Sequence, residues 1–169
     1  TLVQELTRGY FYKEVFEDSK LPLTKIDIDN EEIKGDRILL ANAQMIKLIV
    51  DAGNNKICED DDFLKSLLNS VVEGGHGSFN AIYHIFYGLM QLFKRKSKNS
   101  TIPKAQIKKF MEVLKVRSEF TPQNYKVKYL LLLVLRAAQK GKSDIAKTCY
   151  SDAYDLALDL DNPWYKALC

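Results

Sequence analysis

Hydrophobic residues recur along this chain at intervals of three and four, the spacing that places them on one face of an α-helix. The clearest run lies between Phe63 and Val72, where leucines and valines form two adjacent helical rows. Seven segments show this spacing, and we predict a helix over each of them: Leu2–Glu17, Arg37–Ala52, Asp60–Glu73, Phe79–Phe93, Pro103–Val116, Pro122–Lys140 and Ser143–Leu160. Ile26–Asp29 alternates like a strand but finds no strand partner elsewhere, so we interpret it as an extended connector.

Residues that start and stop helices lie between these segments. Asp36 and Ser143 are placed to cap the helices that follow them, because a short polar side chain can bond the free N–H groups of a first turn. Thr121 is placed as a cap with Pro122 at the first helical position. Gly141 can adopt the left-handed conformation that ends a helix. These signals predict short connections between successive helices.

The predicted elements place the chain in the all-α class. Tight turns are scarce, since there are only four prolines and eight glycines, and no strand pair is visible. About seven antiparallel helices with short connections form either a compact bundle or a short α-solenoid. A length of 169 residues suits a single helical domain over 1–169. The segment Phe79–Phe93 is apolar almost all round, so we expect it at the centre of the core, with Ile82, Phe86, Leu89 and Phe93 buried.

Composition narrows the class of protein further. Hydrophobic residues make up 46% of the chain and charged residues 28%, which is typical of a globular protein. The longest apolar run, Tyr129–Leu135, is far shorter than a membrane span. The three cysteines are far apart and odd in number, which favours reduced thiols and a location in the cytoplasm or nucleus. Because the chain begins at Thr1 without a methionine, we expect it to be part of a longer protein.

The segment Leu130–Leu160 resembles one tetratricopeptide unit. That family places a glycine between two helices, followed by a small residue, an aromatic and an alanine, with a leucine in the first helix. The matching positions here are Gly141, Ala146, Tyr150, Ala153 and Leu133. The sequence departs from the pattern at Val134, Ala137 and Leu158, and no second unit repeats it. The resemblance implies a scaffold that binds a peptide or another protein, in which the aromatic fills the groove between the two helices.

Candidate catalytic and metal-binding patterns fail on inspection. The acidic residues from Asp27 onward lack the glycine and the glutamate that a calcium loop needs at its sixth and twelfth positions. The turn Gly74–Ser78 precedes a helix but lacks the lysine of a phosphate-binding loop. His84 has no second ligand one turn later, so we interpret it as a core histidine bonded to a carbonyl or a tyrosine. We therefore expect neither an enzyme nor a cofactor or metal.

Two surfaces could contact a partner. A basic cluster begins at the end of the Phe79–Phe93 helix and continues on the next helix; it comprises Lys94, Arg95, Lys96, Lys98, Lys108 and Lys109. It could meet nucleic-acid phosphates, an acidic protein segment or an anionic membrane. The other surface is a helix face or groove beside Tyr125, Tyr129 and Arg136.

The sequence thus supports two functional hypotheses. The first is a non-enzymatic protein-interaction domain, a scaffold or adaptor, whose partner is another protein or peptide. The alternative is a nucleic-acid-binding accessory domain that uses the basic cluster around residues 94–109. The net charge of +3 is too small to favour nucleic acid by itself. Aromatic residues are not interleaved with the basic ones, which lowers the case for stacking on single-stranded bases.

Overall fold

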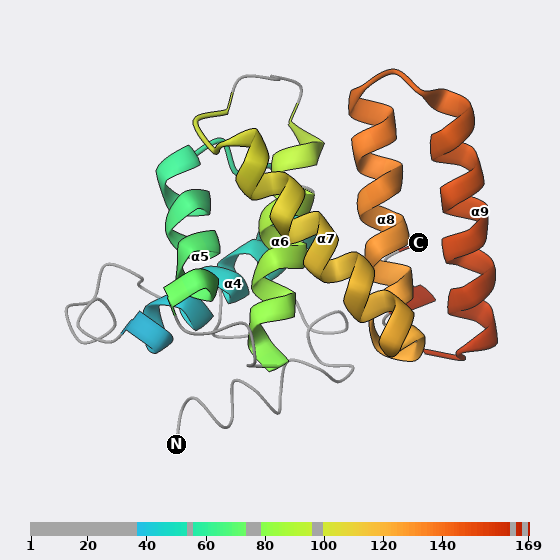
Figure 1. Ribbon diagram of the computed structural model, residues 1–169, viewed down its shortest axis with the longest axis horizontal. Helices are drawn as coiled ribbons and strands as arrows, with labels where there is room; N and C mark the ends of the chain where they lie inside the picture. Colours follow the sequence, from blue (N-terminus) through green and yellow to red (C-terminus); the bar gives the residue numbers. More distant parts are fainter. Residues whose placement is uncertain (1–36, 54–55, 74–78, 96–99, 163–164, 167–168) are drawn as a thin grey trace. The chain divides into compact units, whose positions relative to one another are not determined.

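The computed structural model describes residues 37–53, 56–73, 79–95, 100–162, 165–166 and 169 (Figure 1). These ranges contain six α-helices and no strand, which confirms the all-α class. The predicted Leu2–Glu17 helix, the Ile26–Asp29 connector, the Asp36 cap and the Gly74–Ser78 turn lie outside the described residues. The helix count of about seven is therefore six for the part of the chain that the structure describes.

The chain divides into two compact units, residues 1–56 and residues 57–169. The single domain over 1–169 that the length suggests therefore stays a prediction. In the first unit the described helix is α4, Arg37–Gly53, in agreement with the predicted bounds. Ala43 and Ile46, three residues apart on this helix, are buried. On its exposed side Lys47 and Asp51, one turn apart, form an ion pair of 2.7 Å.

The second unit contains five described helices: α5 Asp61–Glu73, α6 Phe79–Lys94, α7 Lys104–Phe120, α8 Pro122–Gln139 and α9 Ser143–Asp159. Each packs on the next along the chain, and α6 also packs on α8. Figure 1 shows α8 and α9 side by side as an antiparallel hairpin. The helix α8 contacts three others, α6, α7 and α9.

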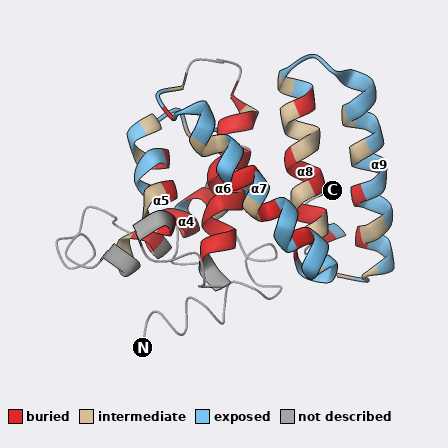
Figure 2. Cartoon of the chain, viewed as in Figure 1, coloured by how far each residue is buried: buried red, intermediate tan, exposed pale blue. Residues whose placement is uncertain are grey.

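The core of this unit is centred on α6, as its apolar sequence predicts. The expected core residues Ile82, Phe86, Leu89 and Phe93 are all at most 6% exposed, and Figure 2 shows α6 buried along almost its whole length. Gly88 lets α5 and α6 approach closely. A Cβ at Gly88 would lie only 3.0 Å from Leu68 Cδ2.

One helix end differs from the prediction by more than one residue. The helix α7 continues four residues beyond Val116, to Phe120. Residues 117–120 contain nothing that breaks a helix, and the proline at 122 disfavours helical geometry only for the residue before it. Thr121 does stand between α7 and α8, but its side chain makes no capping hydrogen bond.

The connection between α8 and α9 is a turn of three residues, Lys140–Lys142. Gly141 has φ +72° as predicted, and its N–H donates to Ala138 O while that of Lys142 donates to Ala137 O, both at 2.9 Å. These two bonds form a Schellman motif. Lys142 O then accepts the first bond of α9, from Ala146 N at 3.1 Å. Lys142 is therefore the N-cap residue, and Ser143 is the first residue of the helix.

None of the described helices combines the length and the apolar character that a bilayer crossing requires.

Candidate protein-interaction site

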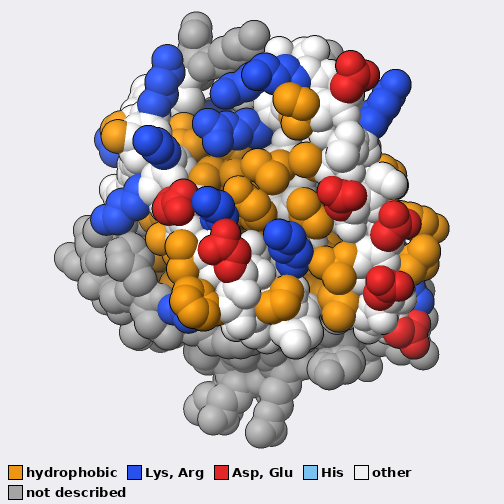
Figure 3. Space-filling model, turned by 45° about the vertical axis from the view of Figure 1, so that its right-hand side comes forward, with side chains coloured by type: hydrophobic (Ala, Val, Ile, Leu, Met, Phe, Trp, Pro, Cys, Tyr) orange, Lys and Arg blue, Asp and Glu red, His pale blue; other side chains and the backbone are white. Residues whose placement is uncertain are grey.

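The surface predicted beside Tyr125, Tyr129 and Arg136 lies on α8. Tyr129 and Arg136 are half-buried, and Leu133 lies between them in the same helical row, also half-buried. Tyr125 is different, since it is 6% exposed and belongs to the interior. Tyr129, Leu133 and Arg136 therefore form one partly accessible row, which we call the α8 strip. Figure 3 shows hydrophobic side chains gathered on this side of the molecule, with Lys and Arg side chains towards one end and acidic side chains along the right edge.

The electrostatic surroundings of Tyr129 identify the charges beside the strip. Burial raises the pKa of the Tyr129 phenol; Lys115 and Arg136 lower that pKa, whereas Glu112 and Glu119 raise it. Three of these charged residues come from α7, so the strip is bordered by a helix that carries both signs of charge. A partner that covers the strip would meet an aromatic ring, an apolar side chain and a guanidinium. Tyrosine and arginine are enriched among the residues that dominate protein interfaces.

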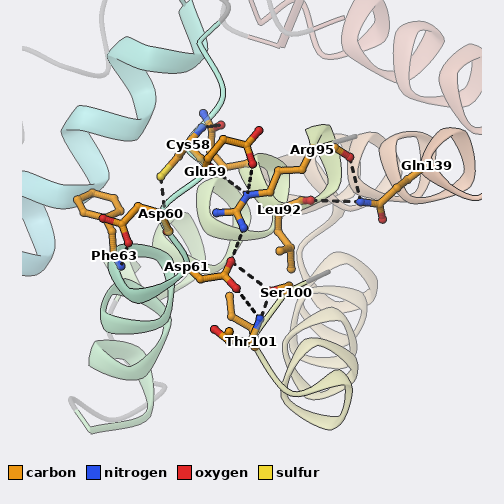
Figure 4. A network of polar contacts seen from close by, with 12 residues as sticks. Cys58, Glu59, Asp60, Asp61, Phe63, Leu92, Arg95, Ser100, Thr101 and Gln139 are labelled. Atoms are coloured by element: carbon orange, nitrogen blue, oxygen red, sulfur yellow. Dashed lines mark hydrogen bonds and ion pairs between the residues drawn. The ribbon is translucent and has the colours of Figure 1, made fainter. Parts of the chain in front are cut away.

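The predicted basic cluster does not form one surface. Arg95 is 4% exposed; its Nη1 pairs with Asp61, and its Nε donates to Cys58 O at 2.7 Å (Figure 4). Glu59 lies farther from the guanidinium, at 3.8 Å. Arg95 is therefore committed to the interior of the unit and cannot meet a phosphate without leaving this network.

Asp61 is the centre of that network. Its carboxylate accepts hydrogen bonds from the Thr101 N–H, from Arg95 and from Ser100 Oγ, the last at 3.3 Å. The Thr101 bond lowers the pKa of Asp61 most, and with Arg95 it outweighs the opposing effect of burial, so that the pKa is about 2. The network thus joins the start of α5, the end of α6 and the segment before α7 (Figure 4). Gln139 of α8 adds to it by donating to Leu92 O and Arg95 O, each at 3.3 Å.

The other members of the basic cluster have separate surroundings. Lys94 is half-buried at the end of α6, whereas Lys108 and Lys109 are exposed on α7. Lys96 and Lys98 lie outside the described residues. What remains of the predicted surface, within the described ranges, is an exposed basic side of α7.

A buried lysine is the polar feature that the sequence reading missed. Lys128 of α8 is 1% exposed; its Nζ donates to Asn124 O at 2.7 Å and to Tyr165 Oη at 2.8 Å. The same nitrogen lies 4.6 Å from the ring centre of Tyr165, 4.8 Å from that of Tyr83 and 5.7 Å from that of Tyr125. Burial lowers the pKa of Lys128 to about 7. Lys128 is three residues after Tyr125 and four before Leu132, both core residues. This helical spacing is the sequence signal that could have predicted its burial.

One residue of the tetratricopeptide resemblance lies where that family would place it, and another does not. Ala153 is fully buried where α9 packs on α8, as the close approach of two helices requires. Tyr150, however, is 42% exposed, and its Oη donates to Cys169 O. The aromatic at this position therefore does not fill a groove between the two helices.

Candidate reactive residues stay isolated in the described part of the chain. There, no three His, Cys, Asp or Glu side chains lie close enough together to hold a metal ion. His84 is buried, and burial lowers its pKa to about 4. Its Nε2 finds no hydrogen-bond partner among the described residues, so the carbonyl or tyrosine expected for this histidine is not found at that nitrogen.

The chain was compared with protein-family models, with curated proteins and with solved structures, and none of the three comparisons finds a significant match.

Proposed function

We propose that this chain is a non-enzymatic interaction domain that binds a segment of another protein along the α8 strip. The observation that carries the proposal is the partial exposure of Tyr129, Leu133 and Arg136 in one row on α8, a helix that packs on three neighbours. Rigid helical packing on the other sides of α8 holds these side chains in place before a partner arrives. Such preorganisation reduces the entropic cost of binding.

The chemistry of the strip defines the partner. Tyr129 and Leu133 suit an apolar anchor side chain, and Arg136 with Lys115 suits an acidic residue beside that anchor. A planar guanidinium can bond a carboxylate through two parallel N–H groups. The proposed partner is therefore a peptide segment, or an exposed helix, that carries an apolar side chain next to a carboxylate.

The test compares proteins captured from a nuclease-treated lysate by the wild-type chain and by variants of the strip. Arg136→Glu reverses the charge at the strip, and Tyr129→Ser removes the aromatic ring. Both should lose the proteins that the wild type captures. Arg117→Glu is the matched control, because Arg117 is an exposed arginine of α7 and is not among the charges that surround Tyr129.

The proposal is contradicted if the strip variants, at unchanged melting temperature, capture the same proteins as the wild type. It is contradicted as well if nuclease treatment removes every captured protein, since that result assigns the interaction to nucleic acid.

One observation supports the alternative of a nucleic-acid-binding accessory domain. Lys104, Lys108 and Lys109 are all exposed on the first half of α7, so that several positive charges project from one helix. Nonspecific binding of nucleic acid requires little more than such charges. Direct titration with an oligonucleotide tests it, as argued below.

A further inference from the structure

The outer side of α9 carries a partly exposed apolar row, whose first member, Tyr150, donates a hydrogen bond to Cys169 O. Tyr150, Tyr154 and Leu158 follow one another at intervals of four and are 42%, 43% and 46% exposed. The two tyrosine rings stack with their centres 6.4 Å apart. Ala153 and Ala157 face α8 and are buried, so the tyrosine row extends the apolar surface of α9 beyond what α8 covers. Contiguous exposed apolar surface of this kind marks interaction sites.

A second exposed apolar row lies on the outer side of α7. Val116 is 39% exposed and Phe120, four residues later, is 82% exposed. Lys109 and Val113 precede them at helical spacing on the same side of the helix. Arg117 is exposed next to this row. The outer side of α7 thus ends in apolar residues, with the positive charges of Lys109 and Arg117 beside them.

The two helices have opposite charge. The helix α7 contains five basic and two acidic residues, whereas α9 contains four aspartates and one lysine. All four aspartates of α9 are exposed, and Asp155 lies one turn from Leu158. We infer that the outer row of α7 on one copy of this chain docks on the outer row of α9 on a second copy. Phe120 and Val116 would pack on Tyr154 and Leu158, with lysines and Arg117 facing the aspartates.

Charge also determines the kind of assembly. Two α9 rows facing each other would bring eight aspartates together, and two α7 rows would bring together two net positive helices. Only the α7–α9 pairing joins opposite charges. Because the two surfaces differ, each contact joins an α7 row to an α9 row, either head to tail from copy to copy or reciprocally within a two-fold dimer. It uses neither Tyr129 nor Arg136, so it is independent of the α8 strip.

Sedimentation velocity of the full chain tests the inference. The average mass should rise with concentration in the range from about 10 µM to about 1 mM, as expected of a weak contact. Raising the salt from about 0.1 M to about 1 M shortens the Debye length from about 10 Å to about 3 Å. It should therefore weaken association about tenfold or more.

Two variants identify the surfaces. Phe120→Asp places a negative charge in the α7 row, where it would face the aspartates of α9, and Tyr154→Ser removes an apolar anchor from the α9 row. Each variant alone should sediment as a monomer. Ile57→Asp is the matched control, since Ile57 is also an exposed apolar residue, at 41%, but belongs to neither row; it should associate like the wild type.

Mixing the two variants distinguishes a contact between α7 and α9 from a pairing of like surfaces. The Phe120→Asp copy keeps an intact α9 row and the Tyr154→Ser copy keeps an intact α7 row, so an equimolar mixture should form a dimer that does not grow further. A chain that stays monomeric at every concentration and salt overturns the inference. So does a mixture that remains monomeric although the wild type associates, because that result requires a pairing of like surfaces. Circular dichroism and melting curves establish that both variants are folded.

Discussion

The guanidinium of Arg95 is nearly excluded from solvent, and Asp61 is the carboxylate that pairs with it directly. Removing one member of a buried ion pair leaves the other charge without compensation. We expect Asp61→Asn to lower the free energy of unfolding by about 3–5 kcal/mol, measured by urea denaturation. The matched control is Asp62→Asn on the next residue, which is exposed and should change stability by less than about 0.5 kcal/mol.

The same carboxylate predicts an acid dependence. The pKa of Asp61 is lowered to about 2 in the folded chain, so its contribution to stability is present above the ordinary carboxyl pKa and is lost as the pH falls towards 2. The difference in unfolding free energy between the wild type and Asp61→Asn should therefore shrink from pH 5 to pH 2. A constant difference over that range would show that the ionised carboxylate is not the stabilising species.

Lys128 predicts a second pH dependence of stability, caused by a buried cation instead of a paired carboxylate. Its pKa is lowered to about 7 in the folded chain, so the unfolded chain binds more protons above that pH and stability rises as the pH increases. Below pH 7 the cost of burying the ammonium is fully present. Relative to Lys128→Met, which cannot titrate, the wild type should gain about 2–3 kcal/mol between pH 7 and pH 9, at about 1.4 kcal/mol for each pKa unit. Equilibrium unfolding at the two pH values measures this gain.

The matched control for that measurement is Lys142→Met, since Lys142 is exposed. Its stability should follow that of the wild type at both pH values. If the stability of Lys128→Met also follows that of the wild type at both pH values, Lys128 is not buried against Tyr165 in solution.

At the scale of the helices, the packing of α5 on α6 depends on Gly88. Alanine in a helix interior is ordinarily favoured over glycine by about 1 kcal/mol. Here the added Cβ would lie 3.0 Å from Leu68 Cδ2 and 3.2 Å from Leu68 Cγ, and Leu68 is completely buried. We therefore expect Gly88→Ala to destabilise the chain by about 1–3 kcal/mol, the usual cost of overpacking. Thermal and urea unfolding measure it.

A second substitution separates this clash from other causes. Leu68→Ala removes the atoms that the new methyl group would meet, so the double variant should be less destabilised than the sum of the two single variants. Additive effects would mean that Gly88 and Leu68 do not share this contact, because non-additivity is expected only of residues that touch.

Most helices could be predicted from the sequence because their apolar residues repeat at the helical period and their ends carry local signals. The α6 core and the left-handed Gly141 are cases in which such signals were sufficient. The end of α7 carries no local signal, because nothing in residues 117–120 breaks a helix, and the first residue of α9 depends on how the preceding turn closes. Lys142, for example, completes the turn after α8 and opens α9 at once.

At the scale of the whole molecule, the functional surfaces were harder to predict than the helices. Arg95 reads as part of a basic run, and its burial depends on Asp61 and Cys58, more than thirty residues earlier in the chain. Tyr125 and Tyr129 belong to the same helix, but only their position relative to the neighbouring helices decides that the first is buried and the second half-buried. Periodicity finds the buried side of a helix, whereas contacts between distant segments decide which polar residues stay available to a partner.

The burial of Arg95 bears directly on binding to nucleic acid. Each phosphate contact contributes about 0.7–0.9 to the slope of log affinity against log salt, and the six residues of the predicted cluster would give a steep dependence. With Arg95 committed to Asp61, the exposed and described members are Lys108 and Lys109, beside Lys104. We expect no measurable affinity for a generic oligonucleotide at about 0.15 M salt, and at most weak binding at about 0.05 M with a slope no steeper than about −3. Fluorescence anisotropy over a salt series measures both.

The double variant Lys108→Glu/Lys109→Glu should abolish whatever binding remains at low salt while leaving the melting temperature unchanged, because exposed charges contribute little to stability. Arg95→Glu is unsuitable for this purpose, since it would also break the buried ion pair. Binding that persists at about 0.15 M salt with a slope near −5 would instead require more phosphate contacts than Lys104, Lys108 and Lys109 supply, and it would favour the nucleic-acid alternative over the α8 strip.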